Sequence, residues 1–242
     1  MDIVTNWQPK TSYSARTIHG FLVRKLGVSI VSGVYPAGAM MPVEAELLKE
    51  NGVSRTAMRE AIKILTAKGL LESRPRVGLR VRQARDWNLL DPDVLGWYCE
   101  CGGFADIAPK LIQMRCMVEP FAAGIAATQH TQAQIEHLES CYEAMARARN
   151  LEDWITSDLS FHEAILAATG NELLIPLGNM IREGLRIMFG VSAESTKNPF
   201  YSLPLHKAVL DAIKARDPLA AQSAMQAILD GSALTIAQKQ AG

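Results

Sequence analysis

The 242-residue sequence has few cysteines and no long apolar run, and each shortage excludes a class of protein. Four cysteines are too few for the disulfide framework of a small secreted domain, so a reducing compartment fits. No stretch approaches the roughly 18 to 20 uncharged apolar residues of a membrane helix. The first ten residues, MDIVTNWQPK, lack the basic-then-apolar order of a secretory signal. We therefore expect a cytoplasmic protein with no membrane partner.

A net charge is also lacking, but the charged residues are unevenly distributed. Residues 1–85 contain 14 Lys and Arg against 6 Asp and Glu, which gives +8, whereas residues 86–242 contain 11 against 19, which gives −8. A basic module is expected to meet a polyanion, while a separate acidic module has another task. We therefore predict two domains, at 1–85 and 86–242.

Hydrophobic periodicity predicts a helix-turn-helix in the basic domain. Apolar residues recur at helical spacing over 14–32, and a short helix near Pro42 stops at Gly52. Ser54 can cap the next helix, which Gly69 closes. The inward stripe of this last helix is formed by Met58, Ala61, Ile62 and Leu65. Two helices separated by a short turn that contains glycine make a helix-turn-helix.

The second helix of this motif carries basic side chains on one face. At 100° per residue, Arg55, Arg59 and Lys63 lie beside the buried stripe, and Thr56 lies close by. These side chains offer donors to phosphates and base edges. The alternative is a solvated helix face, which is the commoner explanation of an isolated arginine pair. The charge of the whole domain favours DNA binding.

A β-hairpin wing is predicted after this helix. Two short alternating runs, 70–73 and 79–82, flank a turn that contains Arg76 and Gly78. Because the wing is basic and follows the recognition helix, we expect Arg76 and Gly78 to place it on the neighbouring DNA backbone.

Three segments of the basic domain carry a family resemblance. They are Ile30 to Gly38 (IVSGVYPAG), Met41 to Leu47 (MPVEAEL) and Val53 to Ala61 (VSRTAMREA). Together they resemble the winged helix-turn-helix signature of the GntR family of bacterial transcription regulators. The resemblance implies that operator DNA is contacted by Ser54, Arg55, Thr56, Arg59, Arg76 and Gly78. Ala45 stands where many members carry an arginine that contacts a base.

The acidic domain is expected to be all-α, because helical periodicity dominates beyond residue 90. A capping box at Thr131 and Gln134 and a cap at Asp217 mark two of the helix starts. The expected helices cover roughly 92–100, 105–128, 131–149, 151–169, 171–190, 202–215 and 217–237.

Polar residues with metal-binding chemistry occur in two of these helices. Asp158 and His162 are four residues apart and share a helix face, so they could chelate a divalent metal. His206 could add a third ligand if its helix faces theirs. The alternative is a hydrogen-bonded surface pair without metal.

Arg115 falls at the edge of an apolar stripe in the helix expected at 105–128. One interpretation is an ion pair with Glu119, one helical turn away. The other is an anion clamp, because a guanidinium offers bidentate donors to a carboxylate.

A second resemblance covers residues 90–238. The segment Met114 to Pro120 (MRCMVEP), the Asp158 and His162 pair, and Leu205 to Ala208 (LHKA) are similar to motifs of the FCD effector domain of FadR-type GntR regulators. It implies an antiparallel helical bundle, a homodimer, and a cavity that binds a small organic acid beside a metal such as zinc or nickel. Asp158, His162 and His206 match three of the four metal ligands, and Ile228 stands at the fourth.

The resemblance also suggests the chemistry of the effector. Residues 87–97 resemble the interdomain segment of the galactonate-operon repressor branch, which implies a sugar acid such as an aldonate. Its carboxylate would be held by Arg115 and its hydroxyls by Asp158, His162 and His206. The expected fold class is therefore mainly α, with an N-terminal winged helix-turn-helix and a C-terminal helical bundle.

These features favour a ligand-responsive, DNA-binding transcription regulator, usually a repressor by the resemblance. The alternatives are a metal-dependent enzyme that uses Asp158, His162 and His206, and an architectural DNA-binding protein without effector. Against the enzyme, no second carboxylate is recognisable near the Asp158 and His162 pair, and catalysis has no use for a basic winged helix.

Overall fold

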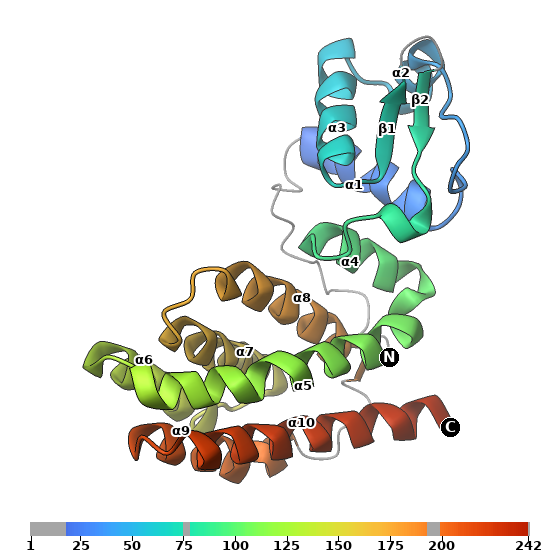
Figure 1. The fold of residues 1–242 in the computed structure, drawn as a ribbon. Coiled ribbons are helices and arrows are strands. Elements are labelled where there is room, and N and C mark those ends of the chain that lie inside the picture. The colour runs from blue at the N-terminus through green and yellow to red at the C-terminus, as the bar shows by residue number, and fades with distance from the viewer. Residues whose placement is uncertain (1–17, 75–77, 193–198, 242) are drawn as a thin grey trace. The chain divides into compact units, whose positions relative to one another are not determined.

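The computed structural model describes residues 18–74, 78–192 and 199–241, and the chain divides into two compact units, Met1–Phe104 and Ala105–Gly242 (Figure 1). None of the helices in these described ranges combines the length and apolar character that a bilayer crossing requires. The fold is mainly helical, and the one sheet within the described ranges has two strands.

The first unit contains the predicted winged helix-turn-helix. Its elements are α1 (Ile18–Val31), α2 (Glu44–Asn51), α3 (Arg55–Ala67), β1 (Leu71–Arg74), β2 (Gly78–Val81) and α4 (Pro92–Tyr98). The strands pair antiparallel, with Leu71 opposite Val81 and Arg74 opposite Gly78. Helix α1 packs on α3 and α4, and the buried side chains of the core include Leu22, Leu26, Ile30, Met58, Leu65, Leu70 and Trp97.

The turn between α2 and α3 has the predicted local chemistry. Gly52 ends α2 in the left-handed region, at φ +62°, and its N–H donates to the Leu48 carbonyl. The Ser54 hydroxyl then accepts from the Ala57 N–H at 3.2 Å, which caps α3. The short helix α2 begins at Glu44, two residues after the expected start at Pro42, because Val43 is still extended.

Helix α4 is fastened to the first unit by a buried ion pair. The ammonium of Lys68, which follows α3, lies 2.8 Å from both carboxylate oxygens of Asp91 and 2.7 Å from Oδ2 of Asp93. Asp91 also caps α4 by accepting from the Asp93 and Val94 N–H groups. This contact joins the end of the recognition helix to the start of α4.

The close approach of Trp97 to α1 adds to this attachment. A Cβ at Gly27 would lie 2.3 Å from the Trp97 ring, so only glycine lets the indole reach the helix. Trp97 and Trp87 are both part of the first unit's core. The compact units therefore divide at 104/105, later than the boundary at 85/86 drawn from charge, because packing and not charge holds residues 86–104 to the first unit.

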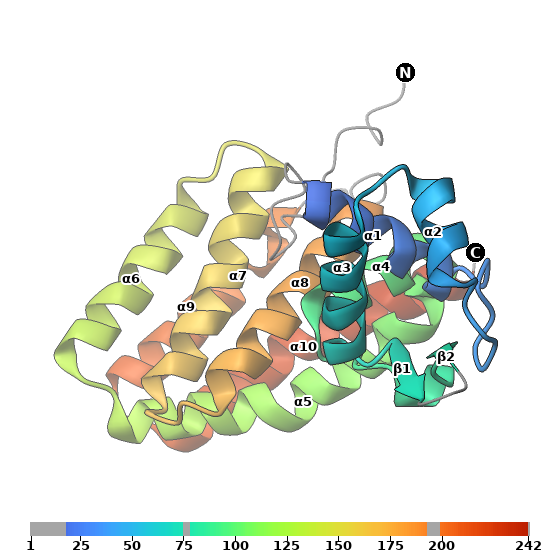
Figure 2. The same cartoon turned by 90° about the horizontal axis from the view of Figure 1, so that it is seen from above.

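The second unit is a bundle of six helices within the described ranges. They are α5 (Phe104–Gln129), α6 (Gln132–Ala146), α7 (Leu151–Ala168), α8 (Leu174–Ser192), α9 (Leu203–Lys214) and α10 (Pro218–Ala241). Figure 2 shows α6, α7 and α8 side by side, and α9 packs on both α6 and α10. Short loops between consecutive helices make these neighbours antiparallel.

Local capping positions these helices as the sequence predicts, with one difference. Thr131 and Gln134 form the capping box of α6, and the Asp217 carboxylate accepts from the Ala220 N–H at the start of α10. Asn171 does not begin a helix. Its side chain accepts from the Leu173 N–H at 3.1 Å and forms a turn, so α8 starts at Leu174.

Candidate functional site

The predicted DNA-binding residues of α3 lie on one exposed face. Arg55, Thr56 and Arg59 are exposed, and Ser54 precedes them as the helix cap. Nε of Arg59 lies 3.4 Å from Oε1 of Glu44, but the side chains are 65% and 41% exposed, and a pair so open to water contributes little. The guanidinium groups are therefore held outward and can exchange an acidic neighbour for a phosphate or a base.

The wing places Gly78 at the first position of β2, whereas Arg76 lies outside the described residues. Gly78 has φ +108°, a conformation that favours glycine, and a Cβ there would lie 3.2 Å from the Met40 side chain. The hairpin backbone by itself therefore explains this glycine. A DNA contact at Gly78 stays a prediction.

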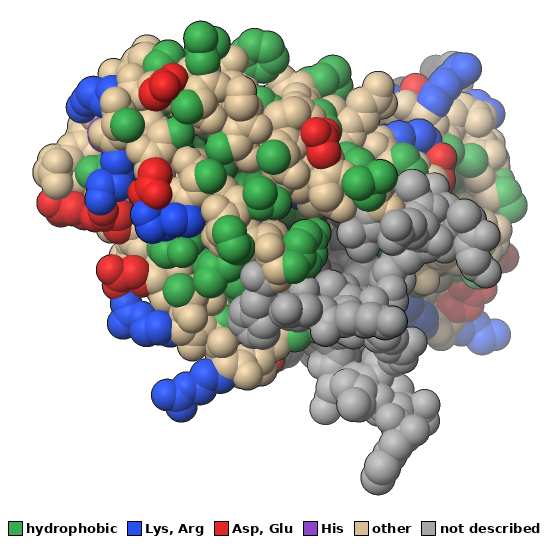
Figure 3. Space-filling model, turned by 90° about the horizontal axis from the view of Figure 1, so that it is seen from below, with side chains coloured by type: hydrophobic (Ala, Val, Ile, Leu, Met, Phe, Trp, Pro, Cys, Tyr) green, Lys and Arg blue, Asp and Glu red, His purple; other side chains and the backbone are tan. Residues whose placement is uncertain are grey.

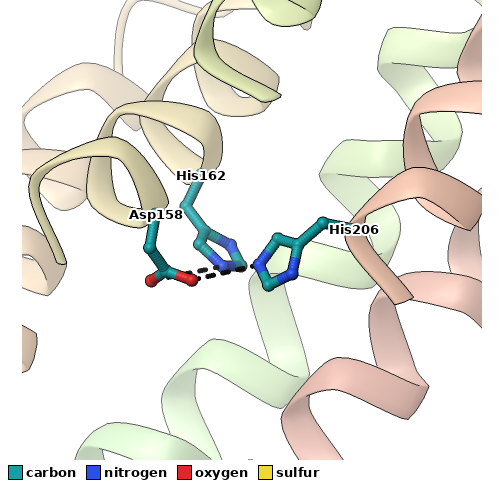
Figure 4. Close-up of side chains that lie close together, drawn as sticks. All are labelled: Asp158, His162 and His206. Atoms are coloured by element: carbon teal, nitrogen blue, oxygen red, sulfur yellow. Dashed lines mark ion pairs between the residues drawn. The ribbon is translucent and has the colours of Figure 1, made fainter. Parts of the chain in front are cut away.

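Five polar side chains of the second unit form a buried cluster. They come from α5, α7 and α9, and their exposed fractions are 2% for Arg115, 1% for Glu119, 6% for Asp158, 3% for His162 and 1% for His206. The structure thus brings together the four residues singled out from the sequence, which lie far apart in the chain. Figure 4 shows three of them pointing toward one another.

Arg115 forms an ion pair with Glu119, which is the first of the two interpretations drawn from the sequence. Its Nε lies 2.6 Å from Oε1 and its Nη2 lies 3.2 Å from Oε2. Burial by itself raises the pKa of Glu119, but the charges of Arg115 and His162 and their hydrogen bonds outweigh it and lower the pKa to about 2. The carboxyl is therefore ionised at neutral pH.

Glu119 also contacts His162, which corrects the expectation that no second carboxylate lies near the Asp158 and His162 pair. Nδ1 of His162 is 2.8 Å from Oε2 of Glu119. Arg115 Nη2 is 3.5 and 3.4 Å from the two ring nitrogens, so it faces the ring between them. Because Glu119 is four residues after Arg115, the sequence indicated that the two could pair. Nothing in the sequence indicated that Glu119 would also contact His162 on another helix.

Asp158 lies between the two imidazoles. Its Oδ1 is 3.0 Å from Nε2 of His206, and its Oδ2 is 4.0 Å from Nε2 of His162. Burial raises the pKa of Asp158, but the close contact with His206 and the charges of His162, His206 and Arg115 outweigh it, so the pKa is lowered. The carboxylate is therefore ionised where the two Nε2 atoms converge.

His206 presents its Nε2 to this point because its other nitrogen is engaged. Nδ1 lies 2.8 Å from the Ser202 carbonyl oxygen, which can only accept, so Nδ1 carries the proton. Although Asp158 is near, it is not aligned with Nε2, which is buried without a hydrogen-bond partner among the described residues. Trp154 and Phe161 pack edge-on against the ring, with centroids 6.2 and 5.2 Å away.

The donor set has the chemistry of a cation site. One ligand atom from each of Asp158, His162 and His206 can be chosen so that all three lie within 4.8 Å of one another. With neutral imidazoles, the charges of Arg115, Glu119 and Asp158 sum to −1, which favours a bound cation. Ile228, at the position of the fourth expected ligand, is buried on α10 and offers no donor.

Comparison with known proteins assigns the family. The model described as bacterial regulatory proteins, gntR family, matches residues 20–81, and the FCD domain matches residues 110–231. The chain therefore belongs to the GntR family of bacterial regulators and carries an FCD domain. It is a DNA-binding transcription regulator, and both resemblances drawn from the sequence are confirmed at this level.

Two relatives from Escherichia coli (strain K12) align with most of the chain. An uncharacterised HTH-type transcriptional regulator, YieP, is 37% identical over 86% of this chain and 90% of its own. The galactonate operon transcriptional repressor is 35% identical over 87% of this chain and 93% of its own. Because these relatives and both families are regulators, the enzyme alternative is not supported.

A solved structure supports the fold. It is that of Lar, which controls the expression of the Listeria monocytogenes agr system, and it has a TM-score of 0.67 over 92% of this chain and 98% of that chain. At 16% identity this likeness shows the fold alone.

Proposed function

We propose that this regulator represses an operon for the catabolism of a sugar acid, and that a small organic acid bound in the helical unit releases it from operator DNA. Two observations on one chain carry the proposal. One unit has an exposed basic helix, and the other has a buried cluster of groups that can bind a carboxylate and hydroxyls. The 35% identity with a galactonate operon repressor supports an aldonate as the class of effector. Repression of an operon would place the protein in the cytoplasm.

On the DNA side, Arg55, Thr56 and Arg59 of α3 would enter the major groove. Ser54 would hold the start of the helix and reach a phosphate, while Arg76 and Gly78 would set the wing on the backbone. The exposure of the α3 side chains supports this assignment, because no core contact restrains them.

We propose that two copies bind DNA as a homodimer joined through the helical unit. Met117, Phe121 and Ile125 repeat every fourth residue of α5 and are 61%, 63% and 41% exposed. Figure 3 views the side of this unit where α9 and α10 lie. Hydrophobic side chains spread over that face, most of the charged ones lie toward one end, and a few acidic ones lie singly between the hydrophobic ones. A face with so few charges can pair with its own copy with little like-charge repulsion.

Light scattering tests the dimer. Phe121→Glu would place a carboxylate opposite its own copy near the two-fold axis, so we expect the variant to be a monomer with unchanged helicity. Leu173→Glu, which adds the same charge at another exposed apolar side chain, is the matched control and should stay dimeric. A dimer that persists in Phe121→Glu would place the interface elsewhere.

The effector would meet Arg115 with its carboxylate and Asp158, His162 and His206 with its hydroxyls. Because Glu119 already occupies one edge of the guanidinium, the acid must share Arg115 with Glu119 or displace it. Either event changes the contacts between α5 and α7, which gives a physical route from binding to a rearranged bundle.

Asp158, His162 and His206 also fit a divalent metal such as zinc or nickel, since imidazole nitrogen and carboxylate oxygen are ligands that both ions accept. The buried Nε2 of His206 supports this fit, because a lone pair 3.0 Å from a carboxylate oxygen needs a cation or a proton between them. A bound metal would supply an electrophilic contact for the effector's oxygens.

The experiment has two stages. Operator sequences are first selected from a random duplex library, and the affinity is measured by fluorescence anisotropy. A panel of aldonates, uronates and dicarboxylates is then titrated by calorimetry against wild type and Arg115→Ala.

We expect an aldonate to bind wild type and weaken DNA binding, and Arg115→Ala to bind operator but ignore the acid. By linkage, operator DNA must weaken acid binding by the same factor. Equal affinity of the best acid for both proteins would remove Arg115 from the site. A panel in which only a neutral sugar binds would overturn the class of effector.

A further inference from the structure

The ring of His162 is held from one side by a carboxylate. Its Nδ1 lies 2.8 Å from Oε2 of Glu119, and an ionised carboxylate can only accept a hydrogen bond. Nδ1 therefore carries the ring proton, and the lone pair of Nε2 is left on the side of Asp158. Partners of this kind fix the tautomer and orientation of histidines that bind metals.

The two imidazoles of the cluster differ in what holds them. His206 donates from Nδ1 to the main-chain carbonyl of Ser202 at 2.8 Å, a contact that a change of side chain does not remove. His162 has the corresponding contact with the Glu119 side chain. Of these two Nδ1 contacts, only the one with Glu119 is made by a side chain, so a substitution can delete it.

Arg115 creates a second requirement for Glu119. Its Nη2 is 3.4 Å from Nε2 of His162, the nitrogen that faces Asp158. A guanidinium charge at this distance would repel a cation bound to Nε2, and burial leaves little water to screen it. Glu119 pairs with the guanidinium through both carboxylate oxygens and so offsets that charge.

We propose that Glu119 is the positioning residue of this site. It fixes His162 as the Nδ1–H tautomer and neutralises Arg115, so that Asp158, His162 and His206 can hold a cation. The inference rests on the metal binding proposed above and adds a residue that does not itself touch the metal. It also implies that removing Glu119 and removing Arg115 have opposite electrostatic effects on the site.

Zinc or nickel alone is the probe, with affinity measured by competition against a chromophoric chelator. Glu119→Gln keeps the shape but loses the charge, and we expect it to weaken metal binding about 10- to 100-fold, the usual cost of losing an outer partner. Arg115→Met/Glu119→Gln removes the uncompensated charge as well and should recover part of the loss. Glu143→Gln, which breaks an exposed pair with Arg147 at the same spacing, should change nothing.

A second readout reports the tautomer without metal. Long-range 15N correlation spectra of metal-free protein should show the proton of His162 on Nδ1 in wild type and a mixture of tautomers in Glu119→Gln. If Glu119→Gln does not fold, the double variant carries the tautomer test, because it removes the buried guanidinium of Arg115 together with the carboxylate that pairs with it.

The outcomes separate the two proposals. Wild type that binds neither zinc nor nickel would overturn the metal site. Metal-binding wild type with an unchanged affinity in folded Glu119→Gln would overturn the role of Glu119, and so would a His162 proton that stays on Nδ1 in that variant.

Discussion

The charged residues of the two units are used in opposite ways. On α3, Arg55 and Arg59 project into solvent, and the acidic neighbour of Arg59 is 3.4 Å away and easily exchanged. In the bundle, Arg115 is 2% exposed and bound by Glu119 through two hydrogen bonds. An exposed arginine can therefore be altered at little cost to folding, whereas a buried one links recognition to the stability of the helices around it.

Lys68 should show the largest effect, because it is a buried charge inside the DNA-binding unit. Lys68→Met removes the cation that pairs with buried Asp93 and half-buried Asp91, which we expect to cost about 3 to 5 kcal/mol of unfolding free energy. Chemical denaturation measures it. Lys63→Met is the control, since Lys63 is exposed and pairs with Glu60, which is itself exposed. Equal losses in both variants would break the contrast between buried and exposed charge.

The same residue gives a pH dependence with a definite sign. Burial lowers the pKa of Lys68, but the hydrogen bonds and charges of Asp91 and Asp93 outweigh it and raise the pKa above that of an exposed lysine. The stabilisation is therefore fully present below the unfolded pKa and is lost as the pH rises through the raised one. In alkaline denaturation, wild type should lose more stability than Lys68→Met over that window.

Arg59 should give the next largest effect, on binding and not on folding. If it contacts a guanine, Arg59→Ala costs about 1 to 3 kcal/mol of operator affinity and relaxes the preference at that base. The unfolding free energy should change by less than about 0.5 kcal/mol, because the side chain is exposed. Anisotropy titrations at fixed moderate salt measure the affinity.

Arg147→Ala, on the exposed end of α6, is the matched control and should leave operator affinity unchanged. Wild-type affinity in an Arg55→Ala/Arg59→Ala variant would remove α3 from the DNA interface. Affinity of the wild type should also fall with salt by about 0.9 log units per log unit of salt for each phosphate neutralised.

Much of the fold could be predicted because its signals are local. Ser54, Thr131 and Asp217 cap helices through bonds to residues three positions away, so the sequence near each start is sufficient. The wing was predictable for the same reason, since its two strands are neighbours in the chain. Asp158 and His162 could be paired from their spacing alone.

The rest depended on contacts between distant residues. The ion pair of Lys68 with Asp91 spans 23 residues and has no periodic signature, so the packing of residues 86–104 against the first unit could not be predicted from the distribution of charge. The approach of His206 to Asp158 and of Glu119 to His162 likewise depends on how helices pack. Sequence patterns name the residues of such a site, but not which of them meet.

Ile228 tests how complete the buried site is, with a smaller expected effect. If the family resemblance aligns it correctly with a metal ligand, Ile228→His should tighten zinc or nickel binding about tenfold. Met225→His, also buried on α10, is the control for placing an imidazole in the core and should not tighten binding. Unchanged metal affinity in a folded Ile228→His variant would contradict the proposed alignment.

Ser54 should give the smallest effect. It contributes to folding as the cap of α3, and it is also proposed to contact DNA. Its hydroxyl caps α3, so Ser54→Ala should cost about 1 kcal/mol of unfolding free energy, whereas Ser54→Asp keeps the cap and should cost little. An aspartate at the start of α3 would, however, repel a phosphate held there. Ser54→Asp should therefore fold like wild type but bind operator more weakly.

Thr131→Asp makes the same exchange at the cap of α6, in the other unit, and should affect neither folding nor operator affinity. Thermal unfolding and anisotropy on the four proteins separate the two roles of Ser54. Wild-type operator affinity in Ser54→Asp would mean that no phosphate approaches the start of α3, and Ser54 would then be a cap alone. The exposed face of α3 would begin at Arg55, one residue further into the helix.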